Sequence, residues 1–204
     1  MRLLQLIDLY FHICKVYENQ LINSCFRHTK NGKQPLFTDQ EVLTCYLFGL
    51  AWEKQLTVKA IHNCMERHYL DWFPLLPGYK AFNNRLNRLS GCLPDLLGHT
   101  LSQWKQDKQA VLTSQLLTDS FPVVLAGNNR YAKVAGGLSN KGYCAVKRLF
   151  YSGVKVHITA WEQAGTLPIP EFITITPASV HDYKAQQHVY QQIKHLTLIG
   201  DKAY

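Results

Sequence analysis

The sequence has no long hydrophobic run and little that resembles a targeting segment. The longest uninterrupted apolar stretch, residues 45–52, is far shorter than the roughly 20 residues that a membrane-spanning helix needs. Near the N-terminus, Gln5 and Asp8 interrupt the apolar residues, and no small-residue cleavage site follows, so the pattern does not match a secretory signal. We therefore expect a cytoplasmic protein without a membrane partner.

Metal-binding and redox motifs built on cysteine or histidine are also missing. The six cysteines form no Cys-x-x-Cys pair, and the nine histidines show no His-x-x-x-His spacing. These absences argue against zinc ribbons and dithiol redox sites. We expect the cysteines to be buried, reduced thiols.

Acidic residues are few. The 204-residue chain has 22 Lys and Arg against 14 Asp and Glu, which gives a net charge of +8, and residues 72–94 and 120–161 contain no acid. Basic proteins often bind polyanions, and nucleic acid is the first candidate. The alternative is that the net positive charge only keeps the protein soluble. Because 47% of the residues are hydrophobic and 12% aromatic, the chain is not of the disordered class.

The first half of the chain has helical periodicity and helix-capping signals. Apolar residues recur at helical spacing from Leu3 to Val16. Thr38 and Glu41 have the spacing of a capping box for a helix that runs to about residue 52, and Thr57 can cap a helix over 58–68. Further helices are predicted over 79–89 and 95–108, so residues 1–112 should form a helical region.

The predicted helix over 79–89 has one apolar face and otherwise polar, mainly basic or amide, side chains. Asn and Arg can make paired hydrogen bonds to adenine and guanine edges in a major groove, and the region has helix-turn-helix proportions. An ordinary amphipathic helix with a solvated face gives the same pattern. The candidate DNA-binding residues here are Lys80, Asn83, Asn84, Arg85, Asn87 and Arg88.

From residue 113 the periodicity changes to that of strands. We predict strands over 115–120, 150–161 and 172–176, a helix capped by Ser179 or Asp182 that runs to about residue 194, and a last strand over 196–201. On the second strand, Val156 and its apolar neighbours face one way and Lys155 and its polar neighbours the other. The last crossover should place the final strand parallel to a neighbour in a mixed α/β sheet.

Asp119 and Asp201 each follow an apolar, strand-like run. Asp is a poor strand residue, and a carboxylate held against a buried sheet is costly unless a divalent cation compensates its charge. Two such ions, about 3.5–4 Å apart, can activate an attacking oxygen and stabilise a leaving one. Each Asp can instead simply begin a turn or cap a helix.

Four segments of the second half resemble, in order, motifs of bacterial insertion-sequence transposases of the DDE class: residues 117–120, 151–157, 175–182 and 199–204. The resemblance implies a ribonuclease H-like sheet over residues 113–204, in which Asp119 and Asp201 lie on neighbouring strands and bind Mg²⁺ or Mn²⁺. It implies in-line phosphoryl transfer on double-stranded DNA, with cleavage at the terminal repeats and joining to target DNA, commonly by a homo-oligomer.

One feature departs from the family. Its third acid, a Glu on a helix after the second Asp, has no counterpart, because residues 202–204 carry no carboxylate. We therefore expect a C-terminally truncated, incomplete catalytic domain with weak or absent strand transfer, an exposed apolar sheet face and poor solubility. Asp182 can in principle replace the missing ligand, but a helix cap is the favoured interpretation. The alternatives are a DNA-binding repressor without catalysis and a decayed remnant without function.

The acid-free stretch after Asp119 is basic and contains several glycines, which predicts a flexible loop that contacts DNA phosphates and binds in a salt-sensitive manner. A solvated loop that happens to be basic is the alternative. The candidate phosphate-binding residues are Arg130, Lys133, Lys141, Lys147, Arg148 and Lys155.

Overall fold

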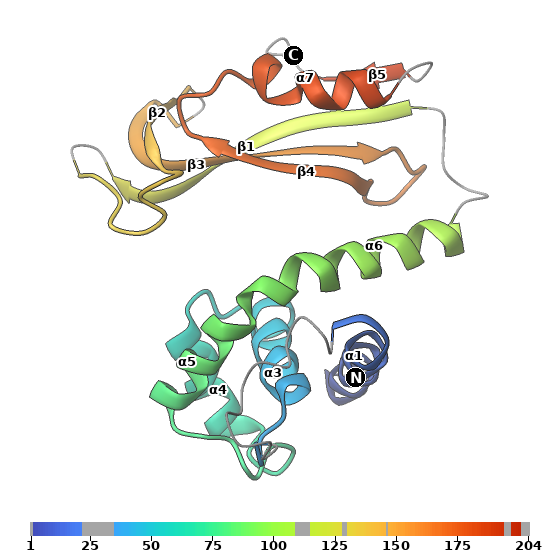
Figure 1. Ribbon diagram of the computed structural model, residues 1–204, viewed down its shortest axis with the longest axis vertical. Coiled ribbons are helices and arrows are strands. Elements are labelled where there is room, and N and C mark those ends of the chain that lie inside the picture. The colour runs from blue at the N-terminus through green and yellow to red at the C-terminus, as the bar shows by residue number, and fades with distance from the viewer. Residues whose placement is uncertain are drawn as a thin grey trace. The chain divides into compact units, whose positions relative to one another are not determined.

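The computed structural model describes residues 2–21, 35–108, 115–127, 130–145, 147–193 and 197–200. The chain divides into two compact units, Met1–Thr100 and Leu101–Tyr204 (Figure 1). The first is helical and the second is built around a mixed sheet, so the predicted α/β class is confirmed. The boundary expected between residues 112 and 113 lies outside the described residues.

Helices make up the first unit, and the last of them runs on into the second. They are α1 (Arg2–Val16), the π-helical turn η1 (Tyr17–Leu21), α3 (Asp39–Ala51), α4 (Val58–His68), α5 (Tyr79–Leu89), the 3₁₀ turn η2 (Ser90–Cys92) and α6 (Leu93–Lys108). Their buried apolar faces meet in one core, which includes Ile13, Val42, Phe48, Ile61 and Phe82. No helix in the described part of the chain is long and apolar enough to cross a membrane.

The predicted helix starts in this unit are confirmed. The Thr38 hydroxyl accepts from the Glu41 amide at 3.2 Å while the Glu41 carboxylate accepts from the Thr38 amide at 2.6 Å, a complete capping box. Thr57 caps α4 by accepting from the Ala60 amide at 3.2 Å. Helix α5 begins after Gly78 with no side-chain cap.

The second unit contains a five-stranded sheet and one helix. Its elements are β1 (Gln115–Gly127), β2 (Asn140–Cys144), β3 (Leu149–Trp161), β4 (Ile169–Pro177), α7 (Asp182–Gln192) and β5 (Thr197–Ile199). Strand β1 lies between antiparallel β3 and parallel β5, while β2 and β4 pair with successive parts of β3. The prediction that the final strand is parallel to a neighbour is confirmed.

Strands β1 and β2 differ from what the sequence predicts. Strand β1 does not end at Ser120 but continues to Gly127, since the β-branched residues beyond Pro122 pair with β3 across a register shift near Val124. Much of the expected loop is therefore strand. Strand β2 was not predicted, because its residues have low strand propensity and are held by pairing with Leu149–Gly153 of β3.

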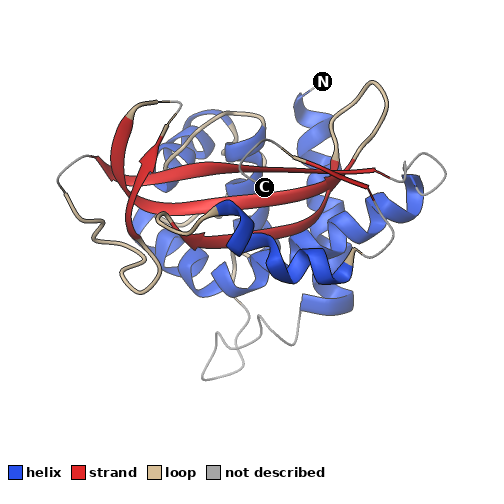
Figure 2. Cartoon of the chain, turned by 90° about the horizontal axis from the view of Figure 1, so that it is seen from above, coloured by secondary structure: helices blue, strands red, loops and turns tan. Residues whose placement is uncertain are grey.

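Helix α7 covers the polar face of the sheet (Figure 2). On that face Thr118, His157 and Thr159 are buried, and Thr159 Oγ1 donates to Gln186 of α7 at 3.3 Å. The opposite face carries apolar side chains that are 42–52% exposed: Phe121, Ile173, Ile175 and Ile199. The sheet therefore buries its polar face, and satisfies it with side-chain hydrogen bonds, while its apolar face stays partly open.

The expectation of buried, reduced thiols holds for Cys45 and Cys64, whereas Cys14 and Cys144 are reduced but only half-buried. Cys14, Cys45, Cys64 and Cys144 are free thiols, and burial raises the pKa of the Cys45 thiol. Cys92 is disulfide-bonded, so the expectation of a reduced thiol is wrong there. Spacing alone could not identify this residue, because a disulfide joins cysteines that are close in space rather than in sequence.

Candidate functional site

Asp119 lies within β1, opposite Ile158 of β3. Its side chain is exposed, and its Oδ1 accepts a hydrogen bond from the Ser120 amide at 2.7 Å. The second oxygen, Oδ2, has no hydrogen-bond partner among the described residues. Because opposed residues of antiparallel strands share a face, Asp119 is on the face of the sheet away from α7.

Strand β5 runs parallel to the start of β1. The paired residues are Gln115 with Thr197, Leu116 with Leu198 and Leu117 with Ile199. Asp119 follows Leu117 by two residues, and Asp201 follows Ile199 by two residues. Asp201 itself lies outside the described residues.

Asp182 lies in the first turn of α7, and its carboxylate contacts both β1 and β3. Its Oδ1 accepts from Lys155 Nζ at 3.1 Å and from Ser120 Oγ at 3.0 Å. The lysine also donates to the Val180 carbonyl at 3.3 Å. The N-cap of α7 is His181, whose Nδ1 accepts from the Tyr183 amide, so the prediction that Ser179 or Asp182 caps this helix is wrong.

His157 belongs to the same buried cluster. Its Nε2 lies 2.8 Å from Thr176 Oγ1, and its Nδ1 lies 3.5 Å from Asp182 Oδ1 without a hydrogen bond. Burial lowers the pKa of this histidine, Asp182 opposes that effect, and Lys155 adds to it. Three of the four motif segments seen in the sequence, carrying Ser120, Lys155 and Asp182, therefore meet in one polar cluster behind β1.

The described residues do not by themselves form a metal centre. No group of three or more His, Cys, Asp or Glu side chains among them is arranged to hold an ion. The polar cluster and Asp119 point to opposite faces of the sheet, so Asp182 is not placed to replace a ligand beside Asp119. An exposed carboxylate whose second oxygen has no partner in the described part of the chain does fit the oxygen-only preference of Mg²⁺, which keeps several waters.

Helix α5 presents four of its six candidate DNA-binding residues on the surface. Lys80, Asn84, Asn87 and Arg88 are exposed, and their spacing places them along one side of the helix. Asn83 is half-buried. We call the four exposed residues the α5 stripe.

Arg85 has a different environment from the α5 stripe. Its Nε and Nη2 donate to Asp39 Oδ1 at 2.8 and 2.5 Å, and its Nη1 donates to the Phe37 carbonyl. The side chains of Arg85 and Asp39 are only 16% and 6% exposed, and Tyr17 also donates to Asp39 at 2.8 Å. The guanidinium thus joins α5 to the start of α3.

The basic residues of the second unit divide in the same way. Arg130, Lys133, Lys141, Lys147 and Arg148 are exposed, on β2 and the loops beside it, whereas Lys155 is paired with Asp182. Exposed aromatic side chains accompany them: Tyr131, Tyr143 and Phe150. The sequence analysis missed these aromatics, and a local signal exists only for Tyr143, which follows Lys141 and Gly142.

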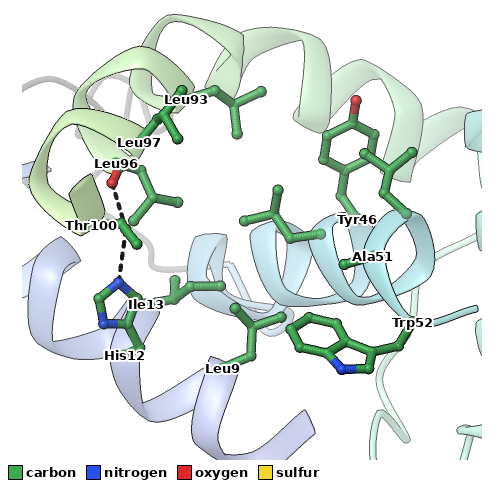
Figure 3. Close-up of a pocket in the computed structure, with 12 residues that line it drawn as sticks. Leu9, His12, Ile13, Tyr46, Ala51, Trp52, Leu93, Leu96, Leu97 and Thr100 are labelled. Atoms are coloured by element: carbon green, nitrogen blue, oxygen red, sulfur yellow. Dashed lines mark hydrogen bonds between the residues drawn. The ribbon is translucent and has the colours of Figure 1, made fainter. Parts of the chain in front are cut away.

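The first unit also has an apolar pocket of about 500 Å³ between α1, α3 and the first half of α6 (Figure 3). At its edge, His12 Nε2 lies 2.9 Å from Thr100 Oγ1, and burial lowers the pKa of His12. The remaining lining is almost wholly aliphatic and aromatic, including Leu9, Trp52 and Leu96.

No protein-family model, curated protein or solved structure matches the chain.

Proposed function

We propose that this protein carries out metal-dependent phosphoryl transfer on DNA, as in transposases of the DDE class, with Asp119 and Asp201 as ligands of Mg²⁺ or Mn²⁺. One observation carries the proposal. Strands β1 and β5 are parallel neighbours with Leu117 opposite Ile199, and each of these residues precedes an aspartate by two positions. Parallel strands in that register bring corresponding positions of two chain segments to the same part of a sheet.

The strand connections support the same proposal. A central β1 with β3 antiparallel on one side and β5 parallel on the other, and with α7 between β4 and β5, is the arrangement that a ribonuclease H-like sheet requires. The polar cluster of Ser120, Lys155 and Asp182 lies directly behind the proposed ligand Asp119. It holds the β1 backbone next to that carboxylate.

In the proposed reaction, the metal ion and the protein would have different roles. A bound divalent ion would neutralise the scissile phosphate and lower the pKa of a bound water. The protein supplies the carboxylate of Asp119, which the Ser120 amide orients, and an exposed position that a duplex can reach. The ligands other than these two carboxylates would be water and phosphate oxygens, which Mg²⁺ accepts readily.

Double-stranded DNA is the proposed substrate. The α5 stripe can reach base edges and phosphates, and the exposed cations Arg130, Lys133, Lys141, Lys147 and Arg148 can hold the backbone. No acidic residue occurs near them in residues 120–161 to repel phosphate.

Two measurements on the full chain test the proposal. Binding of Mn²⁺ is followed by electron paramagnetic resonance, and nicking of a supercoiled plasmid is followed in Mg²⁺ and in Mn²⁺. We expect ion binding and nicking by the unchanged chain, both lost in Asp119→Asn and in Asp201→Asn but retained in Asp71→Asn, which changes an exposed carboxylate of the first unit. Retention of both properties in the Asp119 and Asp201 variants would overturn the proposal.

A second function, DNA binding without catalysis, is favoured by the absence of a three-ligand metal group among the described residues. Such a protein would occupy element ends and repress transposition. It is identified by duplex binding that weakens in Lys80→Ala and Arg88→Ala and shows a strong salt dependence, together with no nicking at any Mn²⁺ concentration.

A further inference from the structure

The hairpin of β2 and β3 exposes two paired aromatic rings. Tyr143 and Phe150 are cross-strand partners, their ring centroids are 4.8 Å apart, and their side chains are 51% and 64% exposed. Large apolar rings are seldom left this open side by side on a soluble protein unless a partner covers them. The pair therefore indicates a binding surface.

A third ring and a cation extend this surface. Tyr131 is 71% exposed, and Lys141 Nζ lies 4.5 Å from its ring centroid. Lys141 shares a strand face with Tyr143, because alternate residues of a strand point the same way. The loop that carries Tyr131 is tied to the hairpin, since the Ala132 amide donates to Ser152 Oγ, and Ser152 pairs with Lys141. We call Tyr131, Lys141, Tyr143 and Phe150 the aromatic face.

The charge around the aromatic face has one sign. Arg130, Lys133, Lys147 and Arg148 are exposed nearby in the chain, and residues 120–161 contain no Asp or Glu. Arg148 occupies the turn between β2 and β3 with a φ of 48°, a left-handed conformation that glycine adopts at lower cost. This turn places the Arg148 cation at the end of the hairpin that carries Tyr143 and Phe150.

We propose that the aromatic face binds an unpaired DNA strand, with bases stacked on Tyr143, Phe150 and Tyr131 and with phosphates held by Lys141, Lys147 and Arg148. Every base has a π-face, so stacking on aromatic rings captures single strands of any sequence, while the cations follow the backbone. A duplex gains little from such rings because its bases are already stacked on each other. The proposal deepens the proposed function, and rests on it for the choice of DNA, because a nick at an element end leaves a strand end that separates from its complement more easily than an intact strand does.

The test compares three fluorescein-labelled probes of about 20 nucleotides with the full chain: oligodeoxythymidine, an abasic strand of the same length, and a duplex. We expect the oligodeoxythymidine to bind about tenfold or more tightly than the abasic strand, because stacking is worth about 1–3 kcal/mol per base. Tyr143→Leu and Phe150→Leu should remove most of that advantage and leave binding of the abasic strand unchanged. Tyr143→Phe keeps the ring and should bind as the unchanged protein does.

A matched control and a salt series separate stacking from charge. Phe11→Leu changes a 66% exposed aromatic of the first unit and should leave all three affinities unchanged. Lys141→Gln and Arg148→Gln should lower the slope of log affinity against log salt, whereas the leucine variants should not. Equal binding of the thymidine and abasic strands overturns the proposal.

Two further measurements distinguish strand binding from self-association and from catalysis. If the leucine variants bind oligodeoxythymidine normally but lose self-association in sedimentation experiments, the occupant of the aromatic face is a second copy of the chain, and the proposal is wrong. Asp119→Asn should bind the thymidine strand normally, so failure of catalysis and failure of strand binding are distinguishable. Leucine preserves the apolar volume at both positions, and circular dichroism checks that the variants fold.

Discussion

Lys155 Nζ lies 3.1 Å from Asp182 Oδ1, and this ion pair joins the middle of β3 to the first turn of α7. Both side chains are mostly buried, at 17% and 16% exposure, and Ser120 of β1 donates to the same carboxylate oxygen. One oxygen atom thus connects three elements that are separate in the sequence. Lys155 and Asp182 belong to the motif segments 151–157 and 175–182, and from the sequence alone they would be attributed to DNA or metal binding. The ion pair gives both residues a structural role instead.

Loss of this pair should destabilise the second unit. Asp182→Ala leaves the mostly buried Lys155 with the Val180 carbonyl as its one remaining partner among the described residues, and it removes the acceptor of Ser120. We expect a loss of about 2 kcal/mol in the free energy of unfolding, measured with urea. Lys184→Met, which changes an exposed lysine of the same helix, should have almost no effect. Equal stability of Asp182→Ala and the unchanged protein would show that the pair contributes nothing.

Stability should also fall on mild acidification because of His157. Burial lowers the pKa of this fully buried histidine below its ordinary value of 6.5, and the groups that face it are Asp182, Lys155 and Thr176. Below pH 6.5 the unfolded chain takes up a proton that the folded protein resists. The contribution is therefore complete above pH 6.5 and is lost as the pH falls towards the folded pKa, by up to about 1.4 kcal/mol per pH unit.

Urea unfolding at pH values between 7.5 and 5 measures this dependence. In His157→Gln the free energy of unfolding should depend less steeply on pH. Some dependence should remain, because burial also lowers the pKa of His12. An unchanged slope in the variant would exclude His157 as a source.

Arg85 should contribute to the stability of the first unit rather than to DNA binding. Arg85→Met leaves the 6% exposed carboxylate of Asp39 without its guanidinium partner, and it also removes the bond to Phe37. We expect a loss of about 3 kcal/mol in unfolding free energy. Arg88→Met, three residues further along α5 and exposed, should leave stability unchanged and weaken duplex binding. If instead both variants weaken binding and neither lowers stability, Arg85 acts on DNA.

Local signals predicted much of the fold, and tertiary pairing determined the rest. The capping residues Thr38 and Thr57 act through neighbours three residues away, so the sequence alone sufficed for the starts of α3 and α4. Strand β2 and the second half of β1 exist because β3 pairs with them, and no local pattern reports that. The inward position of Arg85 depends on Asp39, which is 46 residues away. The part of the candidate site that could be predicted was the Asp119 strand and its parallel neighbour.

Gly153 should tolerate no side chain. A Cβ at this position would clash with the Val123 carbonyl oxygen of the neighbouring strand, beside the register shift of β1. Because the clash is with backbone, β1 and β3 would have to separate, and Gly153→Ala should cost about 3 kcal/mol or more. Gly137→Ala is the matched control, since its Cβ would meet no atom within 4 Å. Hydrogen exchange of the β1 and β3 amides should accelerate in the first variant only.

Substitution of Arg148 should raise the stability of the protein and lower its affinity for single strands. Its φ of 48° is unfavourable for a residue with a side chain, so Arg148→Gly should relieve the turn between β2 and β3 and stabilise the protein by about 1 kcal/mol. The same change removes one cation from the proposed strand-binding surface and should weaken binding of single strands with a smaller salt slope. Thermal unfolding and fluorescence anisotropy measure the two effects on one preparation. A variant that gains stability and keeps its full affinity would show that the strained arginine is not retained for its charge.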